Sequence, residues 1–426
     1  MVLAQADSTP AESRFVTIDP PGPASPLAMV QEYQNDPNPC KVNLLIGAYR
    51  DNDENPWQLT AVKETKRQSN LESLNHEYLP PMGSPEFLQS ARLLAFGPTI
   101  TTEANASMAS IQTVGGTGAN TLIAAFLQRH ARPQNIWLPQ PTWVNHPDIW
   151  RDTAPDVSIK WYPYYDNETQ TLDFLGMMHT LATCAEENDA ILLHACAHNP
   201  TGLDPSQDEW HELALLCKAK KLFVIFDLAY QGFASGDLDR DAWAVRHFCS
   251  HPGIEMAVCQ SFSKNLGLYG ERTGALHVVV ARDDGVAGLA VPTIADHLGD
   301  LHRVMVSMAP RFGSAVAAQI LGSEELRGVW KEDLLVMSGR VKEMRRALYR
   351  ELARRGTPGS WGHILQQTGM FSYTGLGVEE VEVLKREYHI YLLPTGRASI
   401  CGLTTGNVWY VAAAIHDVVT RGLSKK

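Results

Sequence analysis

The sequence predicts an α/β fold, with a largely parallel β-sheet covered by helices and a smaller α+β domain after it. Two patterns among the 426 residues predict this fold. From about residue 115, short apolar runs alternate with helix-length segments, as in parallel strands joined by crossover helices. After about residue 320 the order changes, and a long charged amphipathic segment precedes two short β-like runs.

The elements of the larger part follow in order. A glycine-rich turn at 115–118 opens the first helix, expected over about 120–131. Ser206 begins a capping box with Glu209, which predicts the start of a helix that runs to about residue 220. Buried strands are expected at five apolar runs: 136–138, 191–195, 222–226, 256–259 and 275–281.

The two ends of the chain predict the smaller domain. The first ~45 residues are rich in Pro, Ala and Ser and predict an extended arm that joins this domain. Its other expected elements are a helix over about 326–355, β segments at 370–374 and 389–393, and a helix over about 407–421. The predicted division is 1–45 as the arm and start of the small domain, 46–325 as the large domain, and 326–426 as the small C-terminal domain.

Composition restricts the class of protein. A formal charge of −11 argues against nucleic acid or an anionic membrane as the main partner. No apolar run approaches the ~18–20 residues of a membrane span, and residues 1–14 lack the apolar core of a secretory signal and are too acidic for a mitochondrial presequence. The seven cysteines have no paired metal-ligand spacing and suit reduced thiols, so we expect a cytoplasmic protein without a metal site.

Lys264 lies in the most informative stretch of the chain, residues 261–272 (SFSKNLGLYGER), directly after an expected strand. A lysine that forms a Schiff base beside a phosphate needs such neighbours, because Ser261 and Arg272 can hold the phosphate while the amine reaches an aldehyde carbon. The Ser-x-x-Lys spacing alone is common among solvated lysines. The specificity therefore lies in the whole stretch.

Asp227 and Tyr230 follow another expected strand. An anion beside a pyridine nitrogen keeps a cofactor ring protonated, so that the ring can accept electrons from a substrate carbanion. Tyr230 would donate a hydrogen bond to the phenolate of the same cofactor. The alternatives are that Asp227 caps the following turn and that Tyr230 is a packed aromatic with a satisfied hydroxyl.

Two turns supply further candidates. Asn199 lies in an Asn-Pro-Thr-Gly turn after a buried strand and would bond the same phenolate, unless it serves only the turn. Gly116 and Thr117 open a helix, and N–H groups at a helix N-terminus bind anions. With Ser261 and Arg272 they predict a phosphate cradle made from two distant segments.

Trp143 and Arg397 complete the candidates that the residues themselves suggest. Trp143 is flanked by Pro, Asn and His and fits a ring stacked on a flat cofactor, although most tryptophans belong to the core. His146 supports Asp227 in one interpretation and is a structural histidine in the other. Arg397 stands in a nearly uncharged segment, where an unpaired arginine is costly. Its partner is either a ligand carboxylate or a distant acidic residue of the fold.

These segments resemble, in order and rough spacing, those of class I aminotransferases of the aspartate aminotransferase type. The resemblance runs from about residue 41 to about residue 420 and includes four more segments: 41–50 (KVNLLIGAYR), 74–80 (LNHEYLP), 369–376 (GMFSYTGL) and 389–394 (HIYLLP). It implies a fold type I enzyme dependent on pyridoxal phosphate (PLP), whose large domain contains a mostly parallel seven-stranded sheet.

The resemblance also implies roles for residues. PLP would be bound covalently to Lys264, which would also move the α-proton of the substrate. The other implied cofactor contacts are Asp227 to the ring nitrogen, Asn199 and Tyr230 to the phenolate, Trp143 by stacking, and Gly116, Thr117, Ser261 and Arg272 to the phosphate. In the substrate pocket, Gly47 would form part of the lining and Arg397 would take the α-carboxylate.

Members of this family are homodimers with active sites at the interface. The resemblance therefore implies that Tyr78 reaches the phosphate of the partner subunit and that Arg303 grips a side-chain carboxylate across the interface. The expected reaction is amino-group transfer between L-aspartate and 2-oxoglutarate.

Three alternatives remain open at the level of sequence. Met308 stands where the family usually has Asn, and residues 282–300 diverge from the family pattern. These differences favour a paralogue of a specialised pathway with a less acidic or larger substrate. The same electron sink also serves β-elimination or decarboxylation, and a non-catalytic binding protein is the third alternative.

Overall fold

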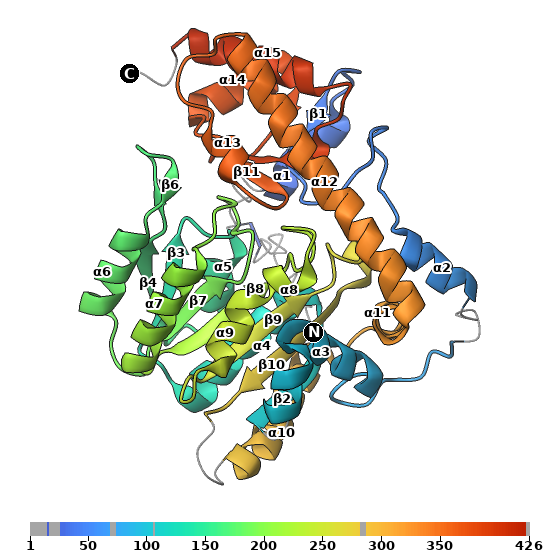
Figure 1. The fold of residues 1–426 in the computed structure, drawn as a ribbon, viewed down its shortest axis with the longest axis vertical. Helices are drawn as coiled ribbons and strands as arrows, with labels where there is room; N and C mark the ends of the chain where they lie inside the picture. The colour runs from blue at the N-terminus through green and yellow to red at the C-terminus, as the bar shows by residue number, and fades with distance from the viewer. Residues whose placement is uncertain (1–14, 17–25, 69–73, 105–106, 282–286, 423–426) are drawn as a thin grey trace, which may run out of the picture.

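The computed structural model describes residues 15–16, 26–68, 74–104, 107–281 and 287–422. Its centre is one seven-stranded sheet (Figure 1). The strands are β2 (Met108–Val114), β3 (Asn135–Gln140), β4 (Ser158–Pro163), β7 (Ala190–His194), β8 (Phe223–Leu228), β9 (Met256–Ser261) and β10 (Thr273–Val279). Their spatial order is β2-β10-β9-β8-β7-β3-β4, and β10 alone runs in the direction opposite to the other six strands. The mostly parallel sheet expected from the sequence is therefore confirmed.

Helices cover both faces of this sheet, as the side chains of β7 show. Ile191 and Leu193 belong to one apolar cluster, and Leu192 between them belongs to a second cluster on the opposite face. The covering helices are α3 (Pro85–Ala104), α4 (Gly115–Phe126), α5 (Asn145–Thr153), α6 (Phe174–Cys184), α7 (Gln207–Ala219), α8 (Leu238–Asp241), α9 (Trp243–Ser250) and α10 (Ala287–Val306). Helix α7 begins with the expected capping box of Ser206 and Glu209.

The helix expected at 120–131 begins earlier than predicted. It starts at Gly115, whose φ of 67° is accessible because glycine has no Cβ, and ends in a π-helical turn, Leu127–Ala131. The glycine-rich turn is thus the first turn of α4.

A second group of elements lies beyond the sheet, at the top of Figure 1. It contains α13 (His363–Gln366), β11 (Phe371–Tyr373), α14 (Val378–Tyr388), β12 (Ile390–Tyr391), β13 (Arg397–Ser399) and α15 (Val408–Thr420). The 31-residue helix α12 (Glu324–Arg354) packs on α15 and α13, and also on α2 (Thr60–Gln68) and α11 (Arg311–Gly322). Strand β1 (Val42–Asn43) pairs with β12, so the N-terminal segment joins the C-terminal one. The exact division of the chain into domains stays a prediction.

The N-terminal arm is less extended than expected. Helix α1 (Pro26–Asn35) begins with proline at its first position, where the missing N–H costs no intrahelical bond. Its Met29 is buried in a cluster with Leu45, Tyr391 and Leu393, and this packing favours a helix over an extended segment. Most of the arm before it, residues 1–14 and 17–25, lies outside the described residues.

Among the helices of the described ranges, none has the length and apolarity to cross a membrane.

Candidate active site

A cavity opens beside the carboxyl ends of β7, β8 and β9, where ligands of open α/β sheets bind. It contains all the site residues predicted from the sequence except Tyr78 and Arg303. Its lining residues are Gly47, Gly116, Thr117, Trp143, His194, Asn199, Asp227, Ala229, Tyr230, Ser261, Ser263, Lys264, Arg272, Phe371 and Arg397. Segments far apart in the chain therefore meet at one place.

Lys264 lies in the turn that follows β9. Burial lowers the pKa of its amine, and the nearby Arg272 and Arg397 lower it further against the opposing effect of Asp227. Its Nζ lies 5.5 Å from the centre of the Tyr230 ring. A lysine with a lowered pKa has more of the neutral amine at neutral pH, and the neutral amine is the nucleophile and base.

Asp227 lies near the end of β8, almost buried, with its Oδ2 3.0 Å from Nε2 of His146. Burial alone would raise the pKa of this carboxyl. The hydrogen bond from His146, together with the neighbouring His194 and Lys264, outweighs burial, so the pKa lies below its usual value. The cavity therefore holds a stable anion at the end of the central strand.

A chain of hydrogen bonds supports that anion. The backbone N–H of Asn199 donates to Nδ1 of His194 over 3.1 Å, so His194 carries its proton on Nε2 and donates to Oγ1 of Thr142 over 3.2 Å. The Thr142 hydroxyl then donates to Nδ1 of His146 over 2.8 Å, which leaves Nε2–H of His146 for Asp227. Burial lowers the pKa of His194 to about 3, which agrees with the neutral ring that this chain requires.

The first turn of α4 approaches Arg272 and Ser261 closely. A Cβ on Gly115 would lie 2.7 Å from Nη2 of Arg272, and one on Gly116 would lie 3.0 Å from Cβ of Ser261. Nη1 of Arg272 also donates to Oγ of Ser263 over 3.3 Å. Backbone N–H groups of a helix N-terminus, hydroxyls and a guanidinium thus surround one space, which is the chemistry of a phosphate site.

Arg397 enters the cavity from the opposite side, on β13. Its Nη2 donates to the carbonyl oxygen of Leu45 over 2.7 Å, and its guanidinium carbon lies 4.1 Å from the centre of the Phe371 ring. Its Nε is buried and has no hydrogen-bond partner, and no acidic group of the described residues forms an ion pair with Arg397. Burial lowers the pKa of Arg397 to about 10, so it remains a cation at neutral pH, and a cation that lines the cavity without an acidic partner suits a ligand carboxylate.

Gly47, Tyr230 and Trp143 shape the rest of the cavity. A Cβ on Gly47 would lie 2.7 Å from Cζ of Phe371, so only glycine fits there without movement of that ring. Tyr230 is buried, and burial together with Asp227 raises the pKa of its hydroxyl, which is therefore a hydrogen-bond donor at neutral pH. The indole of Trp143 meets the His146 ring edge to face, with centroids 5.1 Å apart.

Tyr78 and Arg303 lie outside the cavity. Tyr78 is 75% exposed, and Arg303 is exposed near the end of α10. Within one chain, neither contributes to the site.

Four lining residues, His194, Ala229, Ser263 and Phe371, were not assigned to the site from the sequence. His194 ends a buried strand, and a polar residue at that position is a usable signal. Ser263 adjoins Lys264. Phe371 lies more than a hundred residues further along the chain, and nothing in its local pattern separates it from a core residue.

The chain is similar to known proteins along nearly its whole length. The family model for aminotransferase class I and II matches residues 39–415. An L-tyrosine:2-oxoglutarate aminotransferase of Aspergillus ustus is 48% identical over 399 residues, which cover 92% of this chain and 75% of the relative. A cytoplasmic aspartate aminotransferase of Schizosaccharomyces pombe is 42% identical over 393 residues, which cover 91% and 94%.

Solved structures agree with these relatives. The aspartate aminotransferase from Saccharomyces cerevisiae cytoplasm superposes with a TM-score of 0.91 at 39% identity, covering 96% of this chain and 99% of that one. An aromatic-amino-acid aminotransferase from Burkholderia pseudomallei, covalently bound to pyridoxal phosphate, has a TM-score of 0.88 at 33% identity, covering 96% and 100%.

The fold and the family match define a class of enzyme, and the chain belongs to the aminotransferase class I and II family, with the fold type I architecture. Within that class it is an aspartate aminotransferase-like transaminase that uses pyridoxal phosphate. The residues present fit this cofactor, because the glycine turn of α4 leaves room beside Arg272 and Ser261 for a phosphate, and a buried anion and a buried amine share the cavity.

Proposed function

We propose that this enzyme transfers the amino group between L-aspartate and 2-oxoglutarate, with oxaloacetate and L-glutamate as products, in two half-reactions. The observation that carries the proposal is Arg397, a partly buried cation that lines the cavity and forms no ion pair with an acidic group of the described residues. Amino acids and 2-oxo acids share a carboxylate next to the reacting carbon, and this guanidinium is suited to hold it. The aspartate aminotransferases among the relatives support the choice of aspartate.

The cofactor would be held by this chain at its phosphate, its ring nitrogen, its ring face and its phenolate oxygen. Its phosphate would lie among Gly116, Thr117, Ser261 and Arg272. Asp227 would pair with the ring nitrogen, and Trp143 would stack on the ring. When bound, PLP supplies an electron sink for the charge left on the substrate α-carbon after its proton leaves. Asn199 and Tyr230 would donate hydrogen bonds to the phenolate oxygen from the other side of the cavity.

Lys264 would bind the cofactor and move the proton. Its amine must be neutral to accept a proton from the substrate α-carbon, and burial favours the neutral form by lowering its pKa. Asp227 must be an anion at the same pH, and its bond from His146 keeps it so. The reaction thus requires a neutral Lys264 and a charged Asp227 at the same pH, and the surroundings of each residue favour that form.

The complete site would form in a homodimer. Arg303 and Tyr78 are exposed in the single chain, and three exposed apolar residues follow Arg303: Val304, Met305 and Val306. A contiguous exposed apolar segment next to a substrate-type arginine fits a subunit interface. Arg303 would then hold the side-chain carboxylate of aspartate in the active site of the partner, and Tyr78 would reach the partner's cofactor phosphate.

A second candidate substrate is an aromatic amino acid. The relative from Aspergillus ustus acts on L-tyrosine, and Met308 supplies an apolar side chain close in sequence to Arg303. Both candidates keep 2-oxoglutarate as the acceptor.

A single-turnover experiment separates the two. The purified PLP enzyme is mixed with L-aspartate or with L-tyrosine, and the absorption of the cofactor is followed as it converts to its amino form. We expect fast conversion by aspartate, reversed by 2-oxoglutarate. Conversion by tyrosine at least as fast as by aspartate would replace the first proposal with the second.

The cytoplasmic relative in Schizosaccharomyces pombe supports a cytoplasmic location. A fluorescent fusion that collects in an organelle would contradict it.

A further inference from the structure

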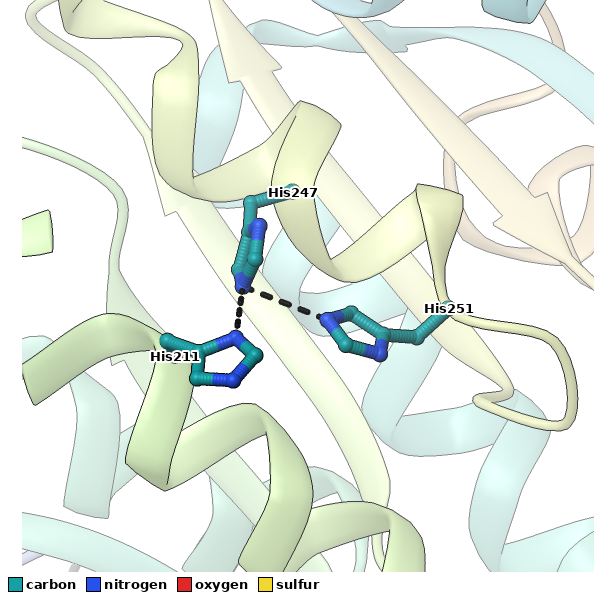
Figure 2. A group of neighbouring side chains, drawn as sticks. All are labelled: His211, His247 and His251. Carbon is teal, nitrogen blue, oxygen red and sulfur yellow. Dashed lines mark hydrogen bonds between the residues drawn. The ribbon is translucent and has the colours of Figure 1, made fainter. Parts of the chain in front are cut away.

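Three histidines lie together on the outside of the large sheet, away from the cavity (Figure 2). His211 belongs to α7, His247 belongs to α9, and His251 directly follows α9. Figure 2 shows their rings turned toward one another across the gap between these two helices. None of the three has a role in the proposed reaction.

Two of the three spacings between their nitrogens match the ligand–ligand distance in the coordination shell of a metal ion. Nδ1 of His211 lies 3.3 Å from Nε2 of His247, and Nε2 of His251 lies 3.2 Å from the same atom. One ring nitrogen of each histidine lies within 4.8 Å of those of the other two. With Zn–N bonds of about 2.0–2.1 Å, two ligands of a tetrahedral site are about 3.3–3.4 Å apart.

Hydrogen bonds among the three rings cannot satisfy all of the nitrogens that face one another. A neutral imidazole nitrogen either carries one proton or offers one lone pair, and Nε2 of His247 faces two other nitrogens. A cation among the three would use three lone pairs at once.

We propose that His211, His247 and His251 bind a divalent transition-metal ion of the Zn²⁺ class, with the fourth position open to water. Imidazole ligands suit Zn²⁺, Cu²⁺ and Ni²⁺, whereas Mg²⁺ and Ca²⁺ require oxygen ligands. Three neutral ligands and an exposed position fit reversible binding better than a permanent structural site.

The sequence predicts no metal site, because the three histidines are too far apart in the chain to form a recognisable motif. His211 and His247 are 36 residues apart, so no short motif joins them. The four-residue separation of His247 and His251 is the only local signal, and two histidines are too few to predict a site.

The site would tie α7 to α9. Beneath the histidines, Trp210 of α7 and Phe248 of α9 pack on Phe226 of β8, the residue before Asp227. Trp243 also stacks on His247, with centroids 4.6 Å apart. A bound ion would add a link between two helices that already share an aromatic core, and would stabilise the folded state by binding it preferentially.

The test uses the PLP-loaded enzyme without a polyhistidine tag, treated with a chelator and then titrated with ZnSO₄ in a calorimeter. We expect about one Zn²⁺ per chain and a rise in the thermal midpoint on addition of the ion. His211→Ala and His247→Ala should each weaken binding at least about 100-fold and abolish the rise. His179→Ala, at an exposed position on α6, is the matched control and should leave binding unchanged.

Either of two binding results would overturn the proposal: no saturable Zn²⁺ binding to the parent enzyme, or equal binding by the parent and His211→Ala. His211 is exposed on a helix surface, so its replacement by Ala leaves the fold intact. The visible absorption of the bound cofactor provides a check that each variant is folded. Replacement of Zn²⁺ by Co²⁺ should give the intense visible bands of a tetrahedral site in the parent, and their absence would likewise contradict the proposal.

Discussion

Arg397 and Arg303 are both expected to bind carboxylates, but they stand in opposite surroundings. Arg397 is held by a backbone carbonyl and an aromatic ring inside the cavity, with one N–H free. Arg303 is exposed on α10, outside the cavity and next to exposed apolar residues. The groups proposed for the chemistry are thus assembled within one chain, whereas the group proposed for the substrate side chain is not.

This difference separates reactivity from specificity. A change in the cavity should affect every amino acid, because each presents the same α-carbon and carboxylate to it. A change on α10 should affect only substrates with a second carboxylate.

Removing the amine tests the cavity most severely. Lys264→Ala should lower the rate of transamination by about 10⁴-fold for aspartate and tyrosine alike, because no other group in the cavity can take the α-proton. Stopped-flow absorption with the cofactor supplied in excess measures this rate. A residual rate within tenfold of the parent would show that another group moves the proton.

Arg397→Leu should lower kcat/KM by about 1,000-fold for both amino acids, because the α-carboxylate loses its charged partner in a buried site. Steady-state assays with each substrate measure the loss. Arg397→Lys keeps the charge without the fork of N–H groups and should recover part of it. A loss confined to aspartate would place Arg397 at the side chain instead.

Arg303→Leu should lower kcat/KM for aspartate by about 100-fold and change that for tyrosine by less than about threefold. Equal losses for the two substrates would contradict the proposed role of Arg303.

A hybrid dimer extends this test to the interface. In a dimer of one Lys264→Ala chain and one Arg303→Leu chain, shared sites leave one site with both residues intact. Mixing the two variants should therefore restore aspartate activity. If both residues act within one chain, no site is complete and mixing restores nothing.

The smallest effect on activity is expected at His146, which hydrogen-bonds to the Asp227 anion. His146→Ala should raise the pKa of Asp227, because the bond that lowers it is lost while burial remains. In the parent, the Asp227 anion contributes its full stabilisation at pH values above the usual pKa of a carboxyl. This stabilisation is lost only when the pH falls through the lowered pKa of Asp227. The variant should lose activity at a higher pH on the acid side, with kcat reduced about tenfold at neutral pH. A pH–rate profile measures the shift, and His146→Gln, which keeps an N–H donor, should reverse part of it.

Much of the fold and the cavity was predictable from local pattern. Lys264, Asp227 and Asn199 each follow an apolar run, and the carboxyl ends of parallel strands meet at one edge of a sheet. The antiparallel direction of β10 has no such signal, since a buried strand has the same composition in either direction. Helix α1 was missed because its stability comes from contacts with residues such as Tyr391, far along the chain.

The remaining gaps also concern distance in sequence. Phe371 contacts Arg397 and limits Gly47, but its own neighbours in the chain are those of an ordinary core strand. Residues 282–286 of the divergent segment lie outside the described residues. The family resemblance predicts a role for Arg303, but the structure of a single chain does not bring this residue to the cavity.

The unpaired guanidinium of Arg397 has a consequence for selection. A partly buried cation with no counter-ion among the described residues destabilises the resting fold, so an apolar side chain of similar length, such as Met, should be more stable at this position. Variants collected for heat resistance alone would therefore accumulate changes at residue 397 that abolish substrate binding. Arginine would be retained there only while activity is selected.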